Sequence, residues 1–588
     1  MFATDASAWS SLPAMFFAQA DRLGDRPLFW AKHGGAYTPI PWSQAARTVA
    51  ALSQGLKALG VGPGDRVVLV ADNRPEWGLA DLAVMTLGAA TVPAYTTNTT
   101  ADHRHILVNS GAKVAIVSSR ALADRLLPAV AEAPELACVV ALEPVAAQAG
   151  GKPVHAWADI VARGGADAAR ARADAARLGR ADLCCIIYTS GTGGVPKGVM
   201  LSHGAILHNC HGARRLFDAI GLDDEVFLSF LPLSHAYEHM AGLMFPLVLG
   251  AQVYYAEGIN DLARNMQEAR PTIMTCVPRL YEVMRARMEA QVKRQGGLPE
   301  KLFDAALALG RRAYRRPLAR GPVERTANWA LERLVRDKIR ARFGGRLKAF
   351  VSGGAPLNPD LGLFFVALGV RLLQGYGQTE SAPVISVNLP ERNKLETVGP
   401  PIAATEVRIA PDGEILVRGE NVMLGYWRDP EATRNAIRDG WLHTGDVGRF
   451  DEDGHLLITD RKKDIIVNSG GDNVAPQRVE GILLLEPEIE QVAVFGDKRP
   501  HLVALVVPSA ERLKALGVDP ADAAAVHDLM GKAIERANRG LSPIEKVRRF
   551  ALAPEPFTIE NGLMTATLKV RRAHVYRKHQ ALIDGLYG

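Results

Sequence analysis

Short β-branched runs alternate with helix-compatible segments in the first third of the chain, and this alternation constrains the fold most. Residues 66–71 (RVVLVA) form one apolar run and residues 92–95 form the next. Residues 75–87, which lie between them, are compatible with a helix. Strand, helix and strand in this order predict βαβ units around a parallel sheet. Residues 121–179 are rich in Ala, Arg and Asp and are interpreted as helices and a surface connection.

From residue 401 onward the pattern changes to short strands separated by turns. Asp-Gly pairs at residues 412–413 and 453–454 lie between alternating strands and predict hairpins. A tail of about 125 residues follows Arg461, with strands expected at 492–495 and 502–507 and a helix around 479–485. We place a domain boundary near residues 460–464.

Composition excludes several classes of protein. A hydrophobic content of 48% excludes disorder as the main state, and a net charge of +6 is weak for a nucleic-acid-binding protein of this length. The five cysteines include no C-x-x-C pair, which indicates a reducing compartment without a disulfide framework. The N-terminal residues lack a basic segment typical of secretion signals, and no apolar run reaches the roughly 18 residues that span a bilayer. We expect a soluble, cytoplasmic protein whose membrane contact is at most peripheral.

Residues 311–348 are strongly basic, with thirteen lysines and arginines against three acids. One interpretation is a solvated helical face. The other is a basic surface for anionic lipid or a phosphate-rich ligand, at the inner face of the membrane. Both interpretations stay open at the level of sequence.

Residues 188–198 (YTSGTGGVPKG) carry the strongest local signal for chemistry. They follow an apolar run at 183–187 that we interpret as a strand. Backbone N–H groups of such a glycine-rich loop can converge on phosphate oxygens. The loop also offers three hydroxyls and one ammonium group, from Thr189, Ser190, Thr192 and Lys197. It is not a Walker A loop, because Pro and Gly flank the lysine, and a flexible turn is the alternative for this segment alone.

Further motifs occur in a fixed order along the chain. They are SGGAPL at 352–357, QGYGQTE at 374–380, TGD at 444–446, DRKKDIIVNSGGDNVAP at 460–476 and MTATLKVRR at 564–572. Together with the glycine-rich loop, this set resembles the adenylate-forming (AMP-binding) superfamily, over essentially the whole chain. The resemblance implies an α/β fold: a large N-terminal domain (1–459) of αβ-layered subdomains plus a small β-barrel-like part, a hinge (460–465), and a small mobile α+β C-terminal domain (466–588).

The resemblance also implies an ATP site with Mg²⁺. The matching positions in this chain are Thr189, Ser190, Gly191, Thr192, Gly194, Lys197, Gly354, Ala355, Pro356, Tyr376, Gly377, Thr379, Asp446 and Arg461. In the family the loop wraps the β- and γ-phosphates, and Thr192 and Glu380 match the positions that hold Mg²⁺. Tyr376 matches the residue that stacks on adenine. Thr379 matches the α-phosphate contact, and Asp446, reinforced by Arg461, matches the acceptor for the ribose hydroxyls. The chain departs from the family at residue 193, where Gly replaces the usual Thr.

Lys569 resembles the family's catalytic lysine, and a plain solvated lysine is the alternative. Joining a carboxylate to the α-phosphate of ATP brings two anions together, so a positive charge between them stabilises the transition state. In the family the small domain then rotates, with Lys463 at the hinge position. The rotation brings Ser469, Gly470 and Gly471 to the channel for CoA, although a plain turn would also explain these residues.

The motif LPLSHAYEH at 231–239 resembles the long-chain fatty acyl-CoA synthetase branch. His235 matches a residue near the acyl carboxylate, whereas Glu238 and His239 have no role that chemistry assigns. A zinc site is rejected, since HAYEH is not H-E-x-x-H and no third ligand is evident. Four apolar residues are candidates for either an acyl pocket or ordinary core: Met240, Leu243, Met244 and Phe245.

The sequence therefore predicts a ligase that makes acyl-CoA, AMP and pyrophosphate from a long-chain fatty acid, ATP and CoA. One alternative is an acyl-AMP ligase that delivers its product to a carrier-protein thiol. Another is a nucleotide-binding scaffold without catalysis. No nucleic-acid partner is expected, and the sequence leaves chain-length specificity and oligomeric state open.

Overall fold

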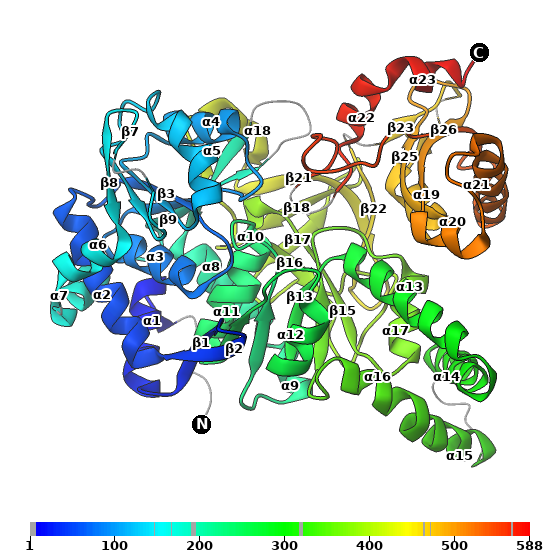
Figure 1. Ribbon diagram of the computed structural model, residues 1–588, viewed down its shortest axis with the longest axis horizontal. Helices are drawn as coiled ribbons and strands as arrows, with labels where there is room; N and C mark the ends of the chain where they lie inside the picture. The colour runs from blue at the N-terminus through cyan, green and yellow to red at the C-terminus, as the bar shows by residue number, and fades with distance from the viewer. Residues whose placement is uncertain are drawn as a thin grey trace.

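The computed structural model describes residues 8–145, 148–165, 167–189, 196–316, 322–462, 465–470, 472–565 and 569–588. Two large sheets with helices around them form most of the N-terminal domain, and a smaller domain follows at the C-terminus (Figure 1). In the described part of the chain, no helix combines the length and apolarity needed to cross a bilayer.

The first large sheet has the strand order β19-β10-β9-β4-β3-β5-β6-β8-β7. Its central strands pair in parallel, and antiparallel pairs occur toward the two edges. The strands are β3 (Arg66–Val70), β4 (Ala90–Pro93), β5 (Val114–Val117), β6 (Cys138–Ala141), β7 (Gln148–Ala149), β8 (Lys152–Ala156), β9 (Leu183–Thr189), β10 (Lys197–Ser202) and β19 (Gly425–Tyr426).

The βαβ expectation is confirmed in this sheet, because β3, α3 (Pro75–Thr86) and β4 follow one another and β3 pairs with β4 in parallel. The interpretation of residues 121–179 is incomplete. The segment holds helices α6 (Trp157–Gly164) and α7 (Ala168–Ala175), but also strands β6 and β8. Strand β6 forms because of its place in the sheet: its four residues pair with β5 and are all buried there.

The second large sheet has the order β16-β15-β14-β13-β11-β12-β1-β2, and the strands from β15 to β1 pair in parallel. Its strands are β1 (Pro27–His33), β2 (Ala36–Pro41), β11 (Val226–Ser229), β12 (Gln252–Tyr255), β13 (Ile273–Cys276), β14 (Ala349–Ser352), β15 (Leu372–Gly377) and β16 (Val384–Val387). Helices α4 (Thr100–Ser110) and α5 (Arg120–Val130) pack on the first large sheet. The other helices of this part of the chain are α1 (Leu12–Leu23), α2 (Trp42–Ala58), α8 (His203–Ala213), α9 (Leu216–Ile220), α11 (Phe245–Leu249) and α12 (Leu262–Ala269).

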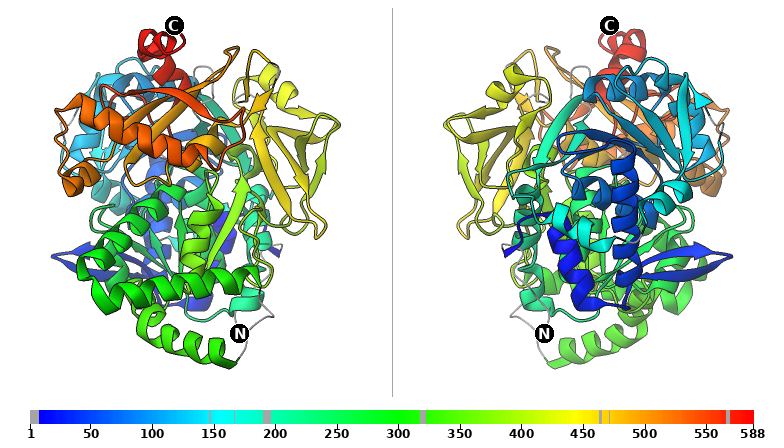
Figure 2. Two further views of the ribbon diagram at one scale, coloured as in Figure 1. Left: turned by 90° about the vertical axis from the view of Figure 1, so that its right-hand side faces the viewer. Right: turned by 90° about the vertical axis from the view of Figure 1, so that its left-hand side faces the viewer.

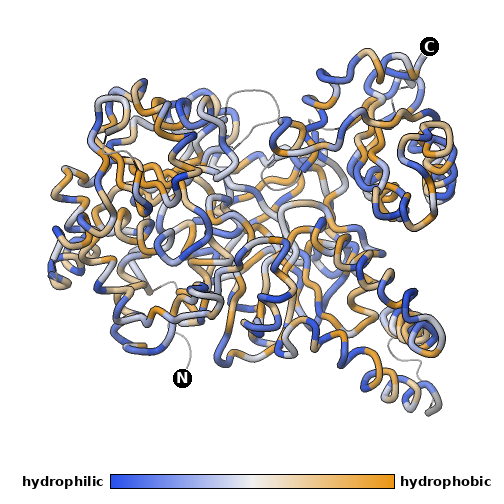
Figure 3. The backbone as a smooth tube through the Cα atoms, viewed as in Figure 1, coloured by the Kyte–Doolittle hydropathy of each residue, from blue (hydrophilic) through white to orange (hydrophobic). Residues whose placement is uncertain are grey.

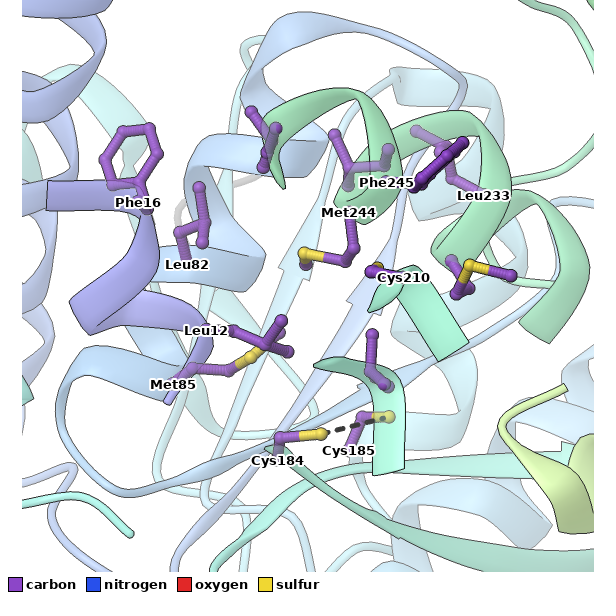
Figure 4. Packing of buried hydrophobic residues seen from close by; sticks show 14 of the residues in the cluster. Leu12, Phe16, Leu82, Met85, Cys184, Cys185, Cys210, Leu233, Met244 and Phe245 are labelled. Atoms are coloured by element: carbon purple, nitrogen blue, oxygen red, sulfur yellow. Dashed lines mark hydrogen bonds between the residues drawn. The ribbon is translucent and has the colours of Figure 1, made fainter. Parts of the chain in front are cut away.

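One buried core joins the two large sheets. It combines apolar side chains from both sheets with others from α1, α3, α8 and the π-helix η2 (His239–Met244). Figure 4 shows Met85 of α3, Cys184 of β9 and Met244 of η2 within this cluster. All five cysteines are free and buried.

A third, antiparallel sheet follows in the order β17-β18-β21-β20, with β22 paired to β21. Both expected Asp-Gly hairpins are confirmed, since antiparallel strands flank each pair. Among the described residues the strand pairings leave this sheet open, so it is not a closed barrel. Its elements are β17 (Glu406–Ile409), β18 (Glu414–Arg418), α18 (Pro430–Ala436), β20 (Ile437–Arg438), β21 (Trp441–Phe450) and β22 (Leu456–Arg461).

The C-terminal domain has its own core on both faces of a three-stranded sheet, β25-β26-β27. Along β26, Leu502, Ala504 and Val506 pack on one face. The intervening Val503 and Leu505 pack on the other face, as the period of two in a strand requires. Figure 2 shows this domain (orange to red) and the antiparallel sheet (yellow) at the same end of the molecule. The elements are β23 (Ile466–Val467), β24 (Asn473–Val474), α19 (Pro476–Leu483), β25 (Ile489–Phe495), β26 (Leu502–Pro508), α20 (Ala510–Leu516), α21 (Ala523–Asn538), β27 (Val547–Leu552), α22 (Arg572–Lys578) and α23 (Gln580–Gly585).

The basic stretch at 311–348 is mainly helical, as expected. Apolar side chains of its helices pack with those of the second large sheet in a separate core cluster. The helices of this region are α13 (Pro278–Gln295), α14 (Gly297–Arg315), α15 (Pro322–Leu331), η3 (Glu332–Arg336), α16 (Asp337–Arg342) and α17 (Pro359–Ala367).

Candidate active site

A cavity of about 1570 Å³ lies between the large domain and the C-terminal domain. Its walls include Thr189 at the carboxyl end of β9 and loops that follow the carboxyl ends of β11, β14 and β15, which is the edge where parallel sheets bind ligands. Residues of the segments 559–565 and 569–574 of the C-terminal domain form part of the opposite side. The predicted site residues that line this cavity are Thr189, Lys197, His235, Gly354, Ala355, Pro356, Tyr376, Gly377, Thr379, Glu380, Arg461 and Lys569.

Several predicted residues do not take part in the described cavity. Ser469 and Gly470 are exposed in a turn in which Gly470 N donates to the Asn468 side chain at 2.9 Å, and neither lines the cavity. The remaining predictions fall on residues outside the described parts of the chain: Ser190, Gly191, Thr192, Gly194, Lys463 and Gly471.

Tyr376, Asp446 and Arg461 form one hydrogen-bonded group. Asp446 on β21 is paired in register with Arg461 on β22, and Arg461 Nε lies 3.0 Å from Asp446 Oδ1. The Tyr376 hydroxyl donates to Asp446 Oδ2 at 2.6 Å. Burial, followed by the charge of Asp446, raises the pKa of Tyr376 well above its usual value. Both Asp446 oxygens are therefore engaged, and Asp446 lies behind the cavity wall while Tyr376 and Arg461 line it.

Glu380 lies in the short 3-10 helix η4 (Thr379–Ser381), directly after β15. Its Oε1 accepts a hydrogen bond from the Tyr426 hydroxyl at 2.8 Å, and its Oε2 accepts none from a described residue. A carboxylate with one oxygen available toward a cavity fits a hard cation that keeps most of its ligands from water and phosphates, as Mg²⁺ does. In the described part of the chain, no group of three or more His, Cys, Asp or Glu side chains is arranged to hold a metal. An all-protein metal cage is therefore not what these residues provide.

Tyr426 also connects Glu380 to the base of the glycine-rich loop. The Lys197 ammonium lies 5.1 Å from the centre of the Tyr426 ring and 3.5 Å from Asp429 Oδ2. Burial and the charge of Glu380 raise the pKa of the Tyr426 hydroxyl, so Tyr426 stays a donor. Sequence reasoning missed Tyr426, and no local signal identifies it, because it lies 46 residues from Glu380 in the chain.

Lys569 lines the cavity from the C-terminal domain, where its backbone contacts Thr565. Thr565 N donates to Lys569 O at 2.8 Å, and Lys569 N donates to Thr565 Oγ1 at 3.1 Å. Across the cavity, His235 caps helix α10 (Ala236–Glu238) by accepting from Tyr237 N at 3.2 Å. Burial, and then the positive charge of Lys569, lower the pKa of His235 to about 4. The lysine of the small domain and the histidine of the large domain therefore face the same space.

An ion pair anchors the chain that follows Lys569. Arg572 Nη2 donates to both carboxylate oxygens of Glu480 on α19, each at 2.7 Å. Glu480 in turn accepts from Val494 N at 2.8 Å. A bidentate arginine–carboxylate pair fixes orientation as well as distance, so this contact holds the start of α22 against α19.

The two residues without an assigned role, Glu238 and His239, are buried behind His235. Glu238 accepts hydrogen bonds from the Ser229 hydroxyl at 2.7 Å and from the Thr275 hydroxyl at 2.6 Å. Burial raises the pKa of Glu238 to about 7, although these hydrogen bonds act to lower it. His239 Nε2 lies 2.7 Å from Asp81 Oδ2. Burial alone would lower the pKa of His239, but the charge and hydrogen bond of Asp81, with Cys185, raise it to about 10.

The candidate acyl-pocket residues belong to the core. Met240, Leu243, Met244 and Phe245 are all buried in the cluster that joins the two large sheets, and none of them lines the cavity. Figure 4 shows Met244 and Phe245 packed among core side chains. Of the two interpretations of these residues, the structure supports ordinary core.

Comparison with solved structures places the fold. The adenylation domain of a carboxylic acid reductase from Segniliparus rugosus, solved with AMP and a co-purified carboxylic acid, matches with a TM-score of 0.76 at 22% identity. The match covers 98% of this chain and 94% of that one. ATP-bound MatB from Rhodopseudomonas palustris matches with a TM-score of 0.71 at 23% identity, over 97% of this chain and 99% of that one. Both support the division into a large and a small domain within a mixed α/β fold.

Sequence comparison identifies the family. The long-chain-fatty-acid–CoA ligase FadD15 of Mycobacterium tuberculosis is 34% identical over 591 residues, covering 98% of this chain and 97% of the relative. Fatty acyl-CoA synthetase A of Dictyostelium discoideum is 31% identical, over 96% of this chain and 88% of the relative. A model of the AMP-binding enzyme family matches residues 16–427, and a model of its C-terminal domain matches residues 463–588. The cavity with Tyr376, Glu380 and Lys569 thus lies in a chain that belongs to the AMP-binding enzyme family.

Proposed function

We propose that this chain is a long-chain fatty acid–CoA ligase that forms acyl-CoA through an acyl-adenylate. The observation that carries the proposal is the convergence of Tyr376, Glu380 and Lys569, from three distant segments, on one cavity between the domains. The relatives named as long-chain fatty acid ligases, which match over nearly the full length, support the class of acid.

In the first step a carboxylate oxygen of the fatty acid attacks the α-phosphorus of ATP, and the bond to the β-phosphate breaks to release pyrophosphate. Lys569 supplies the positive charge between the two anions in this step. His235, with a pKa of about 4, is neutral at pH 7. It therefore offers a neutral imidazole beside the acyl carboxylate and does not compete with Lys569 as a second cation. Thr189, Lys197 and the loop between them bind the phosphates.

Mg²⁺ fits this site as an ion shared between the protein and ATP. Glu380, together with Thr192 from outside the described residues, would hold it, and neutralisation of the phosphate charge is the chemistry that it supplies when bound. Tyr426 orients the Glu380 carboxylate through its hydrogen bond.

The nucleoside part of ATP lies against Tyr376 and the segment Gly354, Ala355 and Pro356, with Gly377 and Thr379 toward the α-phosphate. The ribose hydroxyls donate to Asp446, whose two oxygens have lone pairs beyond those that accept from Tyr376 and Arg461. The pairing of Asp446 with Arg461 across two adjacent strands supports this role, because the carboxylate is held in place before ATP binds.

In the second step the CoA thiol attacks the acyl carbonyl carbon and AMP leaves as the C–O bond breaks. Lys569 occupies this space in the present arrangement, whereas Ser469 and Gly470 lie outside the cavity. The small domain (466–588) therefore rotates against the large one (1–459) about the hinge 460–465, with Lys463 as pivot. The rotation withdraws Lys569 and brings Ser469, Gly470 and Gly471 to the CoA channel.

The proposed location is the cytoplasm, with peripheral contact at the inner face of the membrane. Five free, buried cysteines support a reducing compartment. The basic helices at 311–348 supply the positive surface for the membrane contact.

The test measures both steps on one preparation. ATP–pyrophosphate exchange is followed with fatty acids of increasing chain length, and thioester formation is followed with free CoA. Exchange with long-chain acids and a CoA thioester are expected. Exchange without a CoA thioester would indicate a carrier-protein acceptor, and no exchange with any fatty acid would refute the proposal.

A further inference from the structure

Trp329 on α15 is 66% exposed to solvent. The structure describes all eight tryptophans of the chain, and the other seven are buried or half-buried. Leu334, one turn further along the continuous helix, is 48% exposed. A tryptophan side chain has an apolar ring and one polar N–H, and such side chains are enriched at interfaces where one part is apolar and the other is wet. The exposed indole next to an exposed leucine therefore marks this helix as a candidate contact surface.

Two arginines flank this tryptophan on the same side of the helix. Arg325, Trp329 and Arg333 are spaced by four residues, which places them on one face of the helix, and all three are exposed. Figure 3 shows both hydrophobic and hydrophilic residues along α15. An apolar anchor between cationic side chains is the pattern of helices that lie in a membrane interface.

The acids of the basic stretch do not neutralise this face. Glu324 pairs with Arg312 at 2.7 Å, and Glu332 and Asp337 both pair with Arg340 at 2.6 Å. The remaining described cations of the stretch form no ion pair with a described residue: Arg311, Arg315, Arg316, Arg325, Arg333, Lys338, Arg342 and Arg346. All three acids are thus used internally, and the exposed charge is positive.

The surface is also separate from the candidate active site. Figure 1 shows α15 at the edge of the molecule, and both views of Figure 2 show it projecting at the bottom, away from the C-terminal domain. No residue of α14 or α15 lines the cavity. A contact made through α15 therefore leaves the cavity open.

We propose that one surface, formed by Arg325 and Trp329 of α15 with Arg333 and Leu334 of η3 and called the α15 surface, docks on an anionic lipid bilayer. Charge complementarity and the single indole favour this occupant, because a bilayer accepts one apolar anchor on a narrow projecting helix. A stable protein interface needs a broader complementary area, on the order of 1,000 Å² or more. The inference deepens the proposed function, since a ligase for an apolar acid gains from residing where the acid partitions, but it does not depend on catalysis.

The test is flotation of the full chain with vesicles of phosphatidylcholine mixed with phosphatidylglycerol, compared with phosphatidylcholine alone. Loss of each interfacial charge lowers the partition coefficient about fivefold at low salt, so Arg325→Gln/Arg333→Gln is expected to lower it by more than tenfold. Trp329→Ser is expected to lower binding at both low and high salt, whereas Trp329→Phe retains most of it. Two control variants change exposed residues elsewhere and are expected to float like the wild type. Arg434→Gln/Arg539→Gln carries the same pair of changes, and Leu516→Ser replaces another exposed apolar side chain by serine.

A second readout keeps folding and catalysis separate from docking. Pyrophosphate exchange and the thermal unfolding midpoint are expected to be unchanged in all these variants, so loss of flotation reports on the surface alone. Trp329 contributes the part of the tryptophan fluorescence that is missing in Trp329→Phe. In the wild type, this part of the emission is expected to shift to shorter wavelength when vesicles are added. Two outcomes would overturn the proposal, whether or not the chain is active as a ligase. In one, the wild-type protein stays with the unbound fraction; in the other, the variants of the α15 surface float as the wild type does.

Discussion

Replacing Lys569 by alanine is expected to separate the two half-reactions. The Lys569 backbone is held by two hydrogen bonds with Thr565 that do not involve the Lys569 side chain, so this contact survives the substitution. What is lost is the charge that faces His235 across the cavity. Removing one preorganised group of this kind costs about 2.7–4 kcal/mol of transition-state stabilisation, or roughly 10²–10³ in rate. A full positive charge placed between two anions lies at or beyond the upper end of that range.

The assay pairs two measurements on the same Lys569→Ala preparation. ATP–pyrophosphate exchange is expected to fall by roughly 10²–10³ or more, whereas thioester formation from synthetic acyl-adenylate and CoA stays near the wild-type rate. Lys532→Ala is the matched control, because Lys532 is an exposed lysine of the same domain with only a surface partner. It is expected to leave both rates unchanged.

The outcomes discriminate between explanations. Equal losses in the two assays would mean that Lys569 acts in both steps or is structural, and the proposed rotation about Lys463 would lose its basis. Unchanged exchange would show that the lysine in the motif TATLKVRR has no part in adenylation.

Three further predictions follow from contacts in and behind the cavity. Glu380→Gln is expected to abolish Mg²⁺-dependent pyrophosphate exchange with an unchanged circular dichroism spectrum; retained exchange would remove Glu380 from the metal site. Tyr426→Phe removes a hydrogen bond to a carboxylate, worth about 1.5–3 kcal/mol, and is expected to reduce pyrophosphate exchange about 10- to 100-fold, less than Glu380→Gln does. A loss of exchange as large as that of Glu380→Gln would assign Tyr426 a direct role. Asp81→Asn leaves His239 without its anion and is expected to cost about 3–5 kcal/mol of unfolding free energy near neutral pH, measured in urea. The folded-state pKa of His239 is raised to about 10, so this stabilisation is complete below about pH 6.5 and is lost as the pH rises through 10. The unfolding free energies of the wild type and Asp81→Asn should therefore converge in alkali. A difference that stays constant with pH would contradict the role assigned to this pair.

Local signals in the sequence were sufficient for much of the fold. The Asp-Gly pairs predicted both hairpins of the third sheet, because the turn type and the flanking alternation are local properties. The strand β6 escaped prediction for the opposite reason. Four small apolar residues favour no single state until β5 pairs with them and buries them.

The ordered motifs by themselves identified the family. They also predicted a two-step chemistry and the residue types at the candidate site, since these predictions depend on which side chains are present and in what order. Only the tertiary structure decided which of them meet. Asp446 has both oxygens engaged because β21 and β22 pair in register and Tyr376 comes from another sheet. Likewise, the sequence shows thirteen basic residues at 311–348 but does not indicate which of them have no ion-pair partner. Ion pairs depend on distance in space, and the helices of that region place all three acids against arginines while leaving Arg325, Trp329 and Arg333 exposed.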